Sequence, residues 1–212
     1  MMKHGGASNK ILTARKILLG FVVISFIFLA LDVPAHANAT SSDCRENADT
    51  FLATPNASSV VAVSGVNEQM CWPVIGLSNA NLDRLIHSVE KGNRWAAQYL
   101  AVHLGNLDGG NLEDSLIALG QFADHHMERL LDFAKQGQIS DHELKDALTM
   151  LPLSLSDKPD AQLNVLKARR LRVIKVTRAD LGKQRVAALK VLDDFALEIR
   201  ANAQQTRGEN VK

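Results

Sequence analysis

The sequence predicts an all-α protein in which about six amphipathic helices form a compact bundle or stacked helix pairs. A short disulfide-stapled arm, irregular or β-like, is expected to precede them. From residue 79 onward, apolar residues recur at spacings of three, four and seven, which is the period of one helix face. Capping residues, glycines and prolines divide that region into segments of helical length. Residues 38–78 differ, because they carry few charges and many serine, asparagine and alanine residues.

The first segment, residues 1–37, predicts export. A basic leader precedes an uncharged apolar run at 17–31, which suits a signal peptide better than a membrane span of about twenty residues. Ala35 and Ala37 are the small residues that a signal peptidase requires, so we expect cleavage between Ala37 and Asn38. An uncleaved anchor is the alternative. The cleaved protein would be soluble, periplasmic or secreted, and would meet the membrane only through the signal peptide before cleavage.

The second segment, residues 38–78, is the arm and contains both cysteines. In an oxidising compartment Cys44 and Cys71 most simply pair with each other. Closing a loop of that size stabilises the fold by about 3 kcal/mol. A redox or nucleophilic cysteine is the competing interpretation, but no CxxC spacing is present. The run SSVVAVSG over Ser58–Gly65 is typical of a short strand or hairpin.

The helical domain is expected over residues 79–205, and its first two helices follow from periodicity. LDRLIHSV places apolar residues on one face, namely Leu82, Leu85, Ile86 and Val89. RWAAQYLAVHL continues with the same period, and its apolar side holds Trp95, Tyr99, Val102 and His103. A break follows at Gly105, Gly109 and Gly110.

Caps and prolines mark four further helices. Asn111 is the expected cap of a long amphipathic helix over 112–135. Ser140 and Glu143 form a capping box that opens a short helix. A first-turn proline and a second capping pattern then open the last two helices, at Pro159 and at Thr177 with Asp180. Residues 206–212 are expected to be a flexible tail. No fixed-period repeat decides between a bundle and stacked pairs.

Charge is distributed unevenly along a nearly neutral chain. The chain has 24 Lys and Arg against 23 Asp and Glu; the leader holds four basic and one acidic residue, which leaves 20 and 22. Residues 107–148 hold nine acidic against three basic residues, whereas residues 167–190 hold nine basic and one acidic. Two interpretations stay open. Either these regions pair with each other inside the molecule, or one of them faces a partner of opposite charge.

Two candidate binding faces follow from this distribution. The candidate acidic face consists of Asp124, His125, Glu128 and Asp132. The candidate basic face consists of Lys167, Arg169, Arg170, Arg172 and Lys175. Export disfavours nucleic acid as a partner. A lipid surface fits the basic segment less well as a partner, because LKARRLRVIKV lacks a clean division between basic and apolar sides.

The stretch ADHHMERLL raises the question of a metal site, because His125 and His126 are adjacent. Neighbouring side chains on a helix diverge by about 100°, so these two rings do not readily share one ion. His125 and Glu128 are correctly spaced, but further ligands are not positioned by the sequence. We therefore predict no metal and no cofactor. LDGGNLED likewise fits a helix turn and cap better than a calcium loop.

The sequence favours a non-enzymatic binding protein of the bacterial envelope. It would dock a protein partner through a charged helical face, and an immunity or inhibitor protein is one version. GxSxG, HExxH, P-loop and Rossmann patterns are all missing. Two alternatives remain. One is a metal-dependent envelope enzyme with a cluster around His103, His125, His126 and Glu128; the other is a structural protein of the envelope or lipid surface. The oligomeric state is left open.

Overall fold

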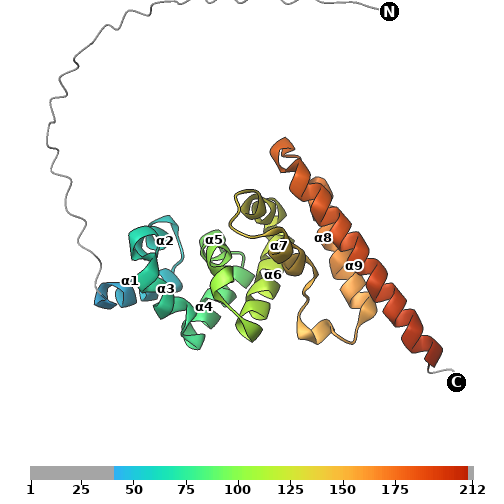
Figure 1. Ribbon diagram of the computed structural model, residues 1–212, viewed down its shortest axis with the longest axis horizontal. Helices are drawn as coiled ribbons and strands as arrows, with labels where there is room; N and C mark the ends of the chain where they lie inside the picture. Colours follow the sequence, from blue (N-terminus) through green and yellow to red (C-terminus); the bar gives the residue numbers. More distant parts are fainter. Residues whose placement is uncertain (1–40, 210–212) are drawn as a thin grey trace, which may run out of the picture. The chain divides into compact units, whose positions relative to one another are not determined.

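The computed structural model describes residues 41–209, and every regular element in that range is a helix (Figure 1). The all-α prediction is confirmed, but the count of about six is wrong, because nine α-helices occupy the described range. The six segments expected after residue 78 each contain one helix, and the arm adds three. The helices are α1 (Ser41–Ala53), α2 (Ala57–Val63), α3 (Glu68–Gly76), α4 (Asn79–Glu90), α5 (Arg94–His103), α6 (Gly109–Lys135), α7 (Asp141–Thr149), α8 (Pro159–Lys175) and α9 (Gly182–Glu209).

The arm is helical where an irregular or β-like segment was expected. SSVVAVSG, interpreted as a strand, supplies most of α2. The Asn56 side chain accepts hydrogen bonds from the N–H groups of Ser58 and Ser59 at 3.0 and 2.9 Å. Ser59 Oγ in turn accepts the N–H of Asn56 at 3.0 Å. This capping box satisfies the first turn of the helix and outweighs the β preference of the valines.

The Cys44–Cys71 disulfide is confirmed and joins α1 to α3, with the two Cα atoms 5.0 Å apart. Both cysteines are fully buried beside the aromatic core of the arm. α1 packs on α2 and α3, and these helices also contact α4 and α5. The arm therefore shares one continuous core with the helices that follow it.

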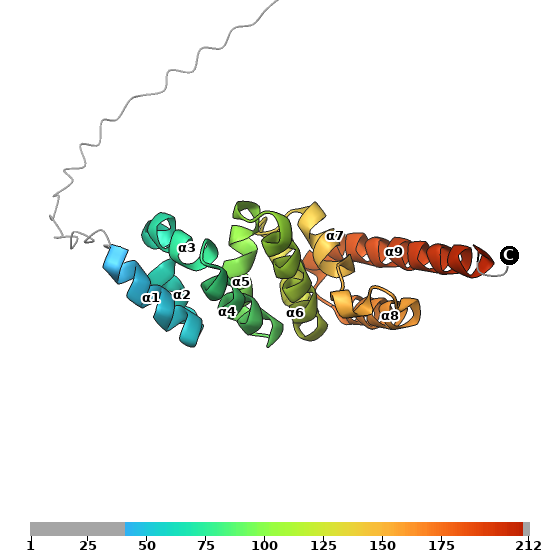
Figure 2. The same ribbon diagram turned by 90° about the horizontal axis from the view of Figure 1, so that it is seen from below.

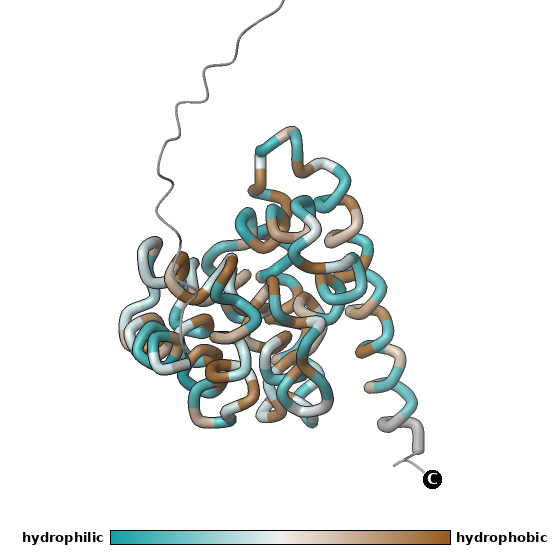
Figure 3. The backbone as a smooth tube through the Cα atoms, turned by 60° about the vertical axis from the view of Figure 1, so that its left-hand side comes forward, coloured by the Kyte–Doolittle hydropathy of each residue, from teal (hydrophilic) through white to brown (hydrophobic). Residues whose placement is uncertain are grey.

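From α4 onward, helices pack chiefly on those near them in sequence (Figures 1 and 2). α4 packs on α5 and α6, α6 packs on α7 and α8, and α9 lies along α8 and contacts α7. Hydrophobic and hydrophilic residues alternate within the turns of these helices (Figure 3), as expected of amphipathic helices. Of the predicted apolar face of α4, Leu82, Leu85 and Val89 are buried, and Ile86 packs at the edge of the core.

The longest of the central helices, α6, departs from the expected helix in two places. It begins at Gly109, where the positive φ of 50° suits glycine, so the cap lies at Asp108 instead of Asn111. It also bends at His126, whose φ of −133° and ψ of 43° are not helical. None of the described helices combines the length and apolar character that crossing a bilayer requires.

Two of the expected boundaries lie near or beyond the ends of the described range. α9 continues to Glu209, beyond residue 205, where the helical domain was expected to end. The 3-10 turn η4 (Ala179–Leu181) directly precedes α9. The signal peptide over 1–37 and its cleavage site at Ala35, Ala37 and Asn38 lie outside the described residues.

Candidate functional site

The predicted acidic and basic faces meet at the junction of α6 with α8. The Asp124 carboxylate accepts hydrogen bonds from Arg169 Nε at 3.2 Å and Nη2 at 3.4 Å. Arg172 lies 3.7 Å from the same carboxylate. Within the molecule, Asp124 therefore already has the positive partners that a docking protein was expected to supply.

Arg169 is buried, so it does not contribute to an exposed basic face. Arg169 is 1% exposed, and its Nη1 donates to the carbonyl oxygens of Leu148 at 2.9 Å and Ala147 at 3.4 Å. A buried guanidinium requires this degree of pairing. Gly120 leaves the necessary room, because a Cβ atom there would overlap the Ala147 carbonyl oxygen and lie 2.8 Å from Arg169 Nη2.

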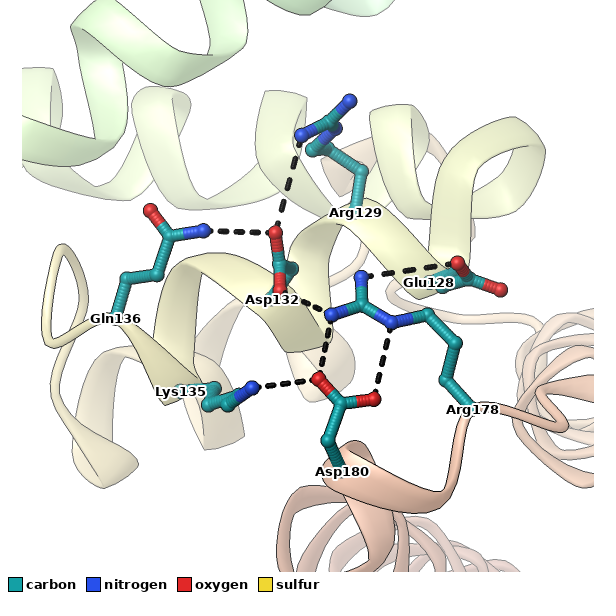
Figure 4. A network of polar contacts seen from close by, with 7 residues as sticks. All are labelled: Glu128, Arg129, Asp132, Lys135, Gln136, Arg178 and Asp180. Carbon is teal, nitrogen blue, oxygen red and sulfur yellow. Dashed lines mark hydrogen bonds and ion pairs between the residues drawn. The ribbon is translucent and has the colours of Figure 1, made fainter.

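A second network joins α6 to η4 (Figure 4). Arg178 Nη2 donates to Asp132 at 3.0 Å and to Asp180 at 2.6 Å. Glu128 lies 3.8 Å from Arg178, and Lys135 Nζ donates to Asp180 at 2.5 Å. A hydrogen bond from Arg178, which has the larger effect, and one from Lys135 hold the pKa of the Asp180 carboxyl well below its usual range. Together with the contacts of Asp124, these contacts engage three of the four residues of the predicted acidic face.

The remaining members of the two faces differ in environment. His125 is exposed on α6, and Arg170 Nε on α8 donates to Asp193 of α9 at 2.7 Å. Lys167 and Lys175 are exposed and form no ion pair with any residue in the described range. Arg178, which sequence reasoning left out of both faces, is the centre of the second network. Its neighbours Thr177 and Asp180 had been interpreted only as a helix cap.

The histidines do not converge. The rings of His125 and His126 lie 6.5 Å apart between centroids, and His126 packs on Phe122. His103 lies elsewhere, in the interior, with Nε2 3.8 Å from Glu68 and its ring stacked on Trp72. Among the residues that the structure describes, no group of three or more His, Cys, Asp or Glu side chains is placed to hold a metal ion.

A groove of about 720 Å³ runs between α8 and α9. Its floor is apolar and is formed by Leu163, Leu166, Leu192, Ala196 and Leu197. Its charged rim is formed by Asp160, Lys167, Arg170, Asp193 and Arg200. Arg170 and Asp193 pair across the groove, whereas Lys167, Arg200 and Asp160 form no ion pair with the described residues, so the unpaired groups are two cations and one anion. One cation on each helix is thus left facing solvent beside an apolar floor.

Comparisons with protein-family models, curated proteins and solved structures find no match. Three features of the molecule therefore remain as candidates for a functional role: the groove, the ion-pair networks and the surroundings of His103. Of these, the ion-pair networks are satisfied internally. The groove and the His103 region retain groups without partners among the described residues.

Proposed function

We propose that this protein is an exported, non-enzymatic binding protein that docks a protein partner in the groove between α8 and α9. The proposed occupant is an amphipathic helix of the partner, with Asp or Glu residues flanking its apolar side. The observation that carries the proposal is the excess of unpaired cations, Lys167 and Arg200 against Asp160, beside an apolar floor. The acidic face of α6 is a poorer docking surface, because arginines of the same chain already neutralise it.

Apolar side chains around the groove support a protein partner. Leu197, which lines the groove, is 61% exposed, and the same two helices carry three further exposed apolar residues outside the lining, namely Leu171, Ile174 and Val186. Exposed apolar surface rimmed by charge is typical of protein interaction sites. An amphipathic helix in an apolar groove is a recurring mode of recognition.

Charge complementarity supports the choice of an acidic flank. Lys167 comes from α8 and Arg200 from α9, so carboxylates on both flanks of a bound helix would each find a cation. Such rim charges contribute more to encounter rate and specificity than to affinity. In the envelope compartment that the predicted leader favours, and with which the disulfide is compatible, an immunity or inhibitor protein is one version of this function.

The deciding experiment tests whether capture depends on the groove. The full chain, with a photo-crosslinking residue at Leu197, would be used to capture partners from envelope extract. We expect one reproducible partner whose capture falls at least about tenfold in Lys167→Glu/Arg200→Glu and weakens with added salt. Lys91→Glu/Lys145→Glu, a matched reversal at two exposed lysines, one directly after α4 and one on α7, should leave capture unchanged.

Two outcomes would contradict the proposal. One is equal capture by both double variants, which would place binding away from the groove. The other is no reproducible partner together with an intrinsic activity of the protein toward an envelope polymer.

A further inference from the structure

A second cavity lies between α2 and α5, away from the α8–α9 groove, and has a volume of about 410 Å³. Its walls are largely apolar and include Val60, Val61, Trp95 and Val102. Glu68, Tyr99 and His103 bring polar groups to the same cavity. Apolar walls with a few convergent polar groups are the usual composition of a small-molecule site.

Four buried side-chain polar atoms in the described range have no hydrogen-bond partner, and of their residues Tyr99 is the one that lines this cavity. Tyr99 is 2% exposed, and its ring packs against Phe51 and His103 at centroid distances of 4.9 and 4.5 Å. Within the described part of the chain, its hydroxyl is buried and has no hydrogen-bond partner. Leaving such a group unsatisfied costs about 1–3 kcal/mol, and native proteins seldom do so. A bound molecule in the cavity would supply the missing partner.

His103 is oriented by its neighbours and is uncharged. Asn106 Nδ2 lies 3.3 Å from Nδ1 and donates to it, which leaves the proton of the neutral ring on Nε2. That nitrogen points toward Glu68, 3.8 Å away. Burial lowers the pKa of His103, although the nearby Glu68 carboxylate opposes the effect. The ring is therefore neutral at neutral pH.

Glu68 sets the charge of the cavity. Among the described residues that line it, Glu68 alone carries a formal charge, and its side chain is 41% exposed. Arg94 lies outside the lining and covers one face of Trp95, 4.6 Å from the ring centroid. A carboxylate or phosphate ligand would be repelled by Glu68, and a neutral ligand would gain no charge–charge attraction from it. A cationic group would instead form a charge-assisted hydrogen bond with the Glu68 carboxylate.

We propose that the cavity between α2 and α5 binds a small organic amine, with its ammonium group between Glu68 and the Tyr99 hydroxyl. The ammonium N–H groups donate to the carboxylate and to the phenolic oxygen. The apolar body of the amine packs on Val60, Val61 and Val102. This site does not depend on the proposed docking function, because it lies on other helices.

The test uses three ligands that share an apolar body and differ in charge. The full chain would be titrated with phenethylamine, 2-phenylethanol and phenylacetate, and binding would be followed by calorimetry and by the fluorescence of Trp95 and Trp72. We expect phenethylamine to bind about tenfold more tightly than the alcohol, because a charge-assisted hydrogen bond adds more than a neutral one. Phenylacetate should bind most weakly.

Two isosteric variants assign the binding to named atoms. Glu68→Gln should weaken phenethylamine binding about tenfold and abolish the preference over the alcohol. Tyr99→Phe removes one oxygen and should weaken binding about fivefold. Glu113→Gln, the same substitution at an exposed position on α6, is the matched control and should bind as the wild type does. Thermal unfolding of each variant shows whether it is folded.

Three outcomes would overturn the proposal. Equal affinity for all three ligands would make the cavity a nonspecific apolar crevice. Unchanged affinity in folded Glu68→Gln and Tyr99→Phe would place the amine elsewhere. No binding of phenethylamine to the wild type at millimolar concentration would show that the cavity is not an amine site.

Discussion

The helices before Gly105 and those after it are held together by different kinds of contact. In α1–α5, a disulfide and a cluster of aromatic rings connect the helices: Tyr99 contacts Phe51, Trp72 and His103, and Trp72 stacks on His103. In α6–α9, Arg169 of α8 and Arg178 of the connection that follows α8 reach to carboxylates and carbonyls of α6 and α7. A single core joins both regions, yet they should respond differently to reductant, acid and salt.

The largest effect is expected at Arg169, in the charged region. Arg169→Met should lower the free energy of unfolding by about 3–5 kcal/mol, because Asp124 and the carbonyl groups at the end of α7 lose their buried donor. Urea unfolding at neutral pH measures the loss. Arg170→Met is the control, since its pair with Asp193 is exposed and its loss should be small. Equal losses in the two variants would contradict the role given to burial.

The disulfide of the aromatic region comes next. Cys44→Ser/Cys71→Ser should lower the free energy of unfolding by about 2–4 kcal/mol. Reductant should destabilise the wild type by a similar amount and leave the double variant unchanged. A wild type that is insensitive to reductant, with the bond shown to be reduced, would assign the stability of this region to the aromatic cluster alone.

Acid should affect the aromatic region through His103. Because burial lowers its folded-state pKa, the unfolded chain binds a proton near pH 6.5 that the folded chain does not. Stability is therefore fully present above that pH and declines as the pH falls through it. His103→Gln should flatten this decline between pH 7 and pH 5, whereas His125→Gln, at an exposed position, should not. Chemical denaturation at several pH values provides the measurement.

The smallest effect is expected at Asp180, in the charged region. Its folded-state pKa is lowered by Arg178 and Lys135, so its contribution is present at neutral pH and is lost as the pH falls below the ordinary range of an aspartate, near pH 4. Asp180→Asn should be slightly less stable than the wild type at pH 7. The difference should shrink in high salt. A difference that persists at pH 2 and in high salt would indicate a packing change instead.

How much could be predicted from the sequence also differs between the two regions. The helices after residue 78 were predictable because period, caps and prolines are local signals, as at Ser140 and Pro159. The helix α2 was missed because two adjacent valines are typical of strands, and the single cap at Asn56 outweighs them. The bend at His126 has no local signal of this kind, since neither proline nor glycine is there.

The candidate sites were harder to predict than the helices. In α8, basic and apolar residues surround the helix on all sides, so nothing in the sequence distinguished the buried Arg169 from the exposed Lys167. Tyr99 and His103 were correctly placed on one side of a helix. That their side chains meet Glu68 depends on contact between helices that periodicity does not describe.

The contacts of Arg169 also determine how the molecule can open. One guanidinium on α8 is bonded to a side chain of α6 and to the last carbonyl groups of α7. If one of these three helices separated from the others, the Arg169 guanidinium would lose hydrogen bonds and its charge would be exposed. We expect their amide protons to exchange with solvent together, as one cooperative unit, and to exchange with less protection when Arg169 is replaced by Met.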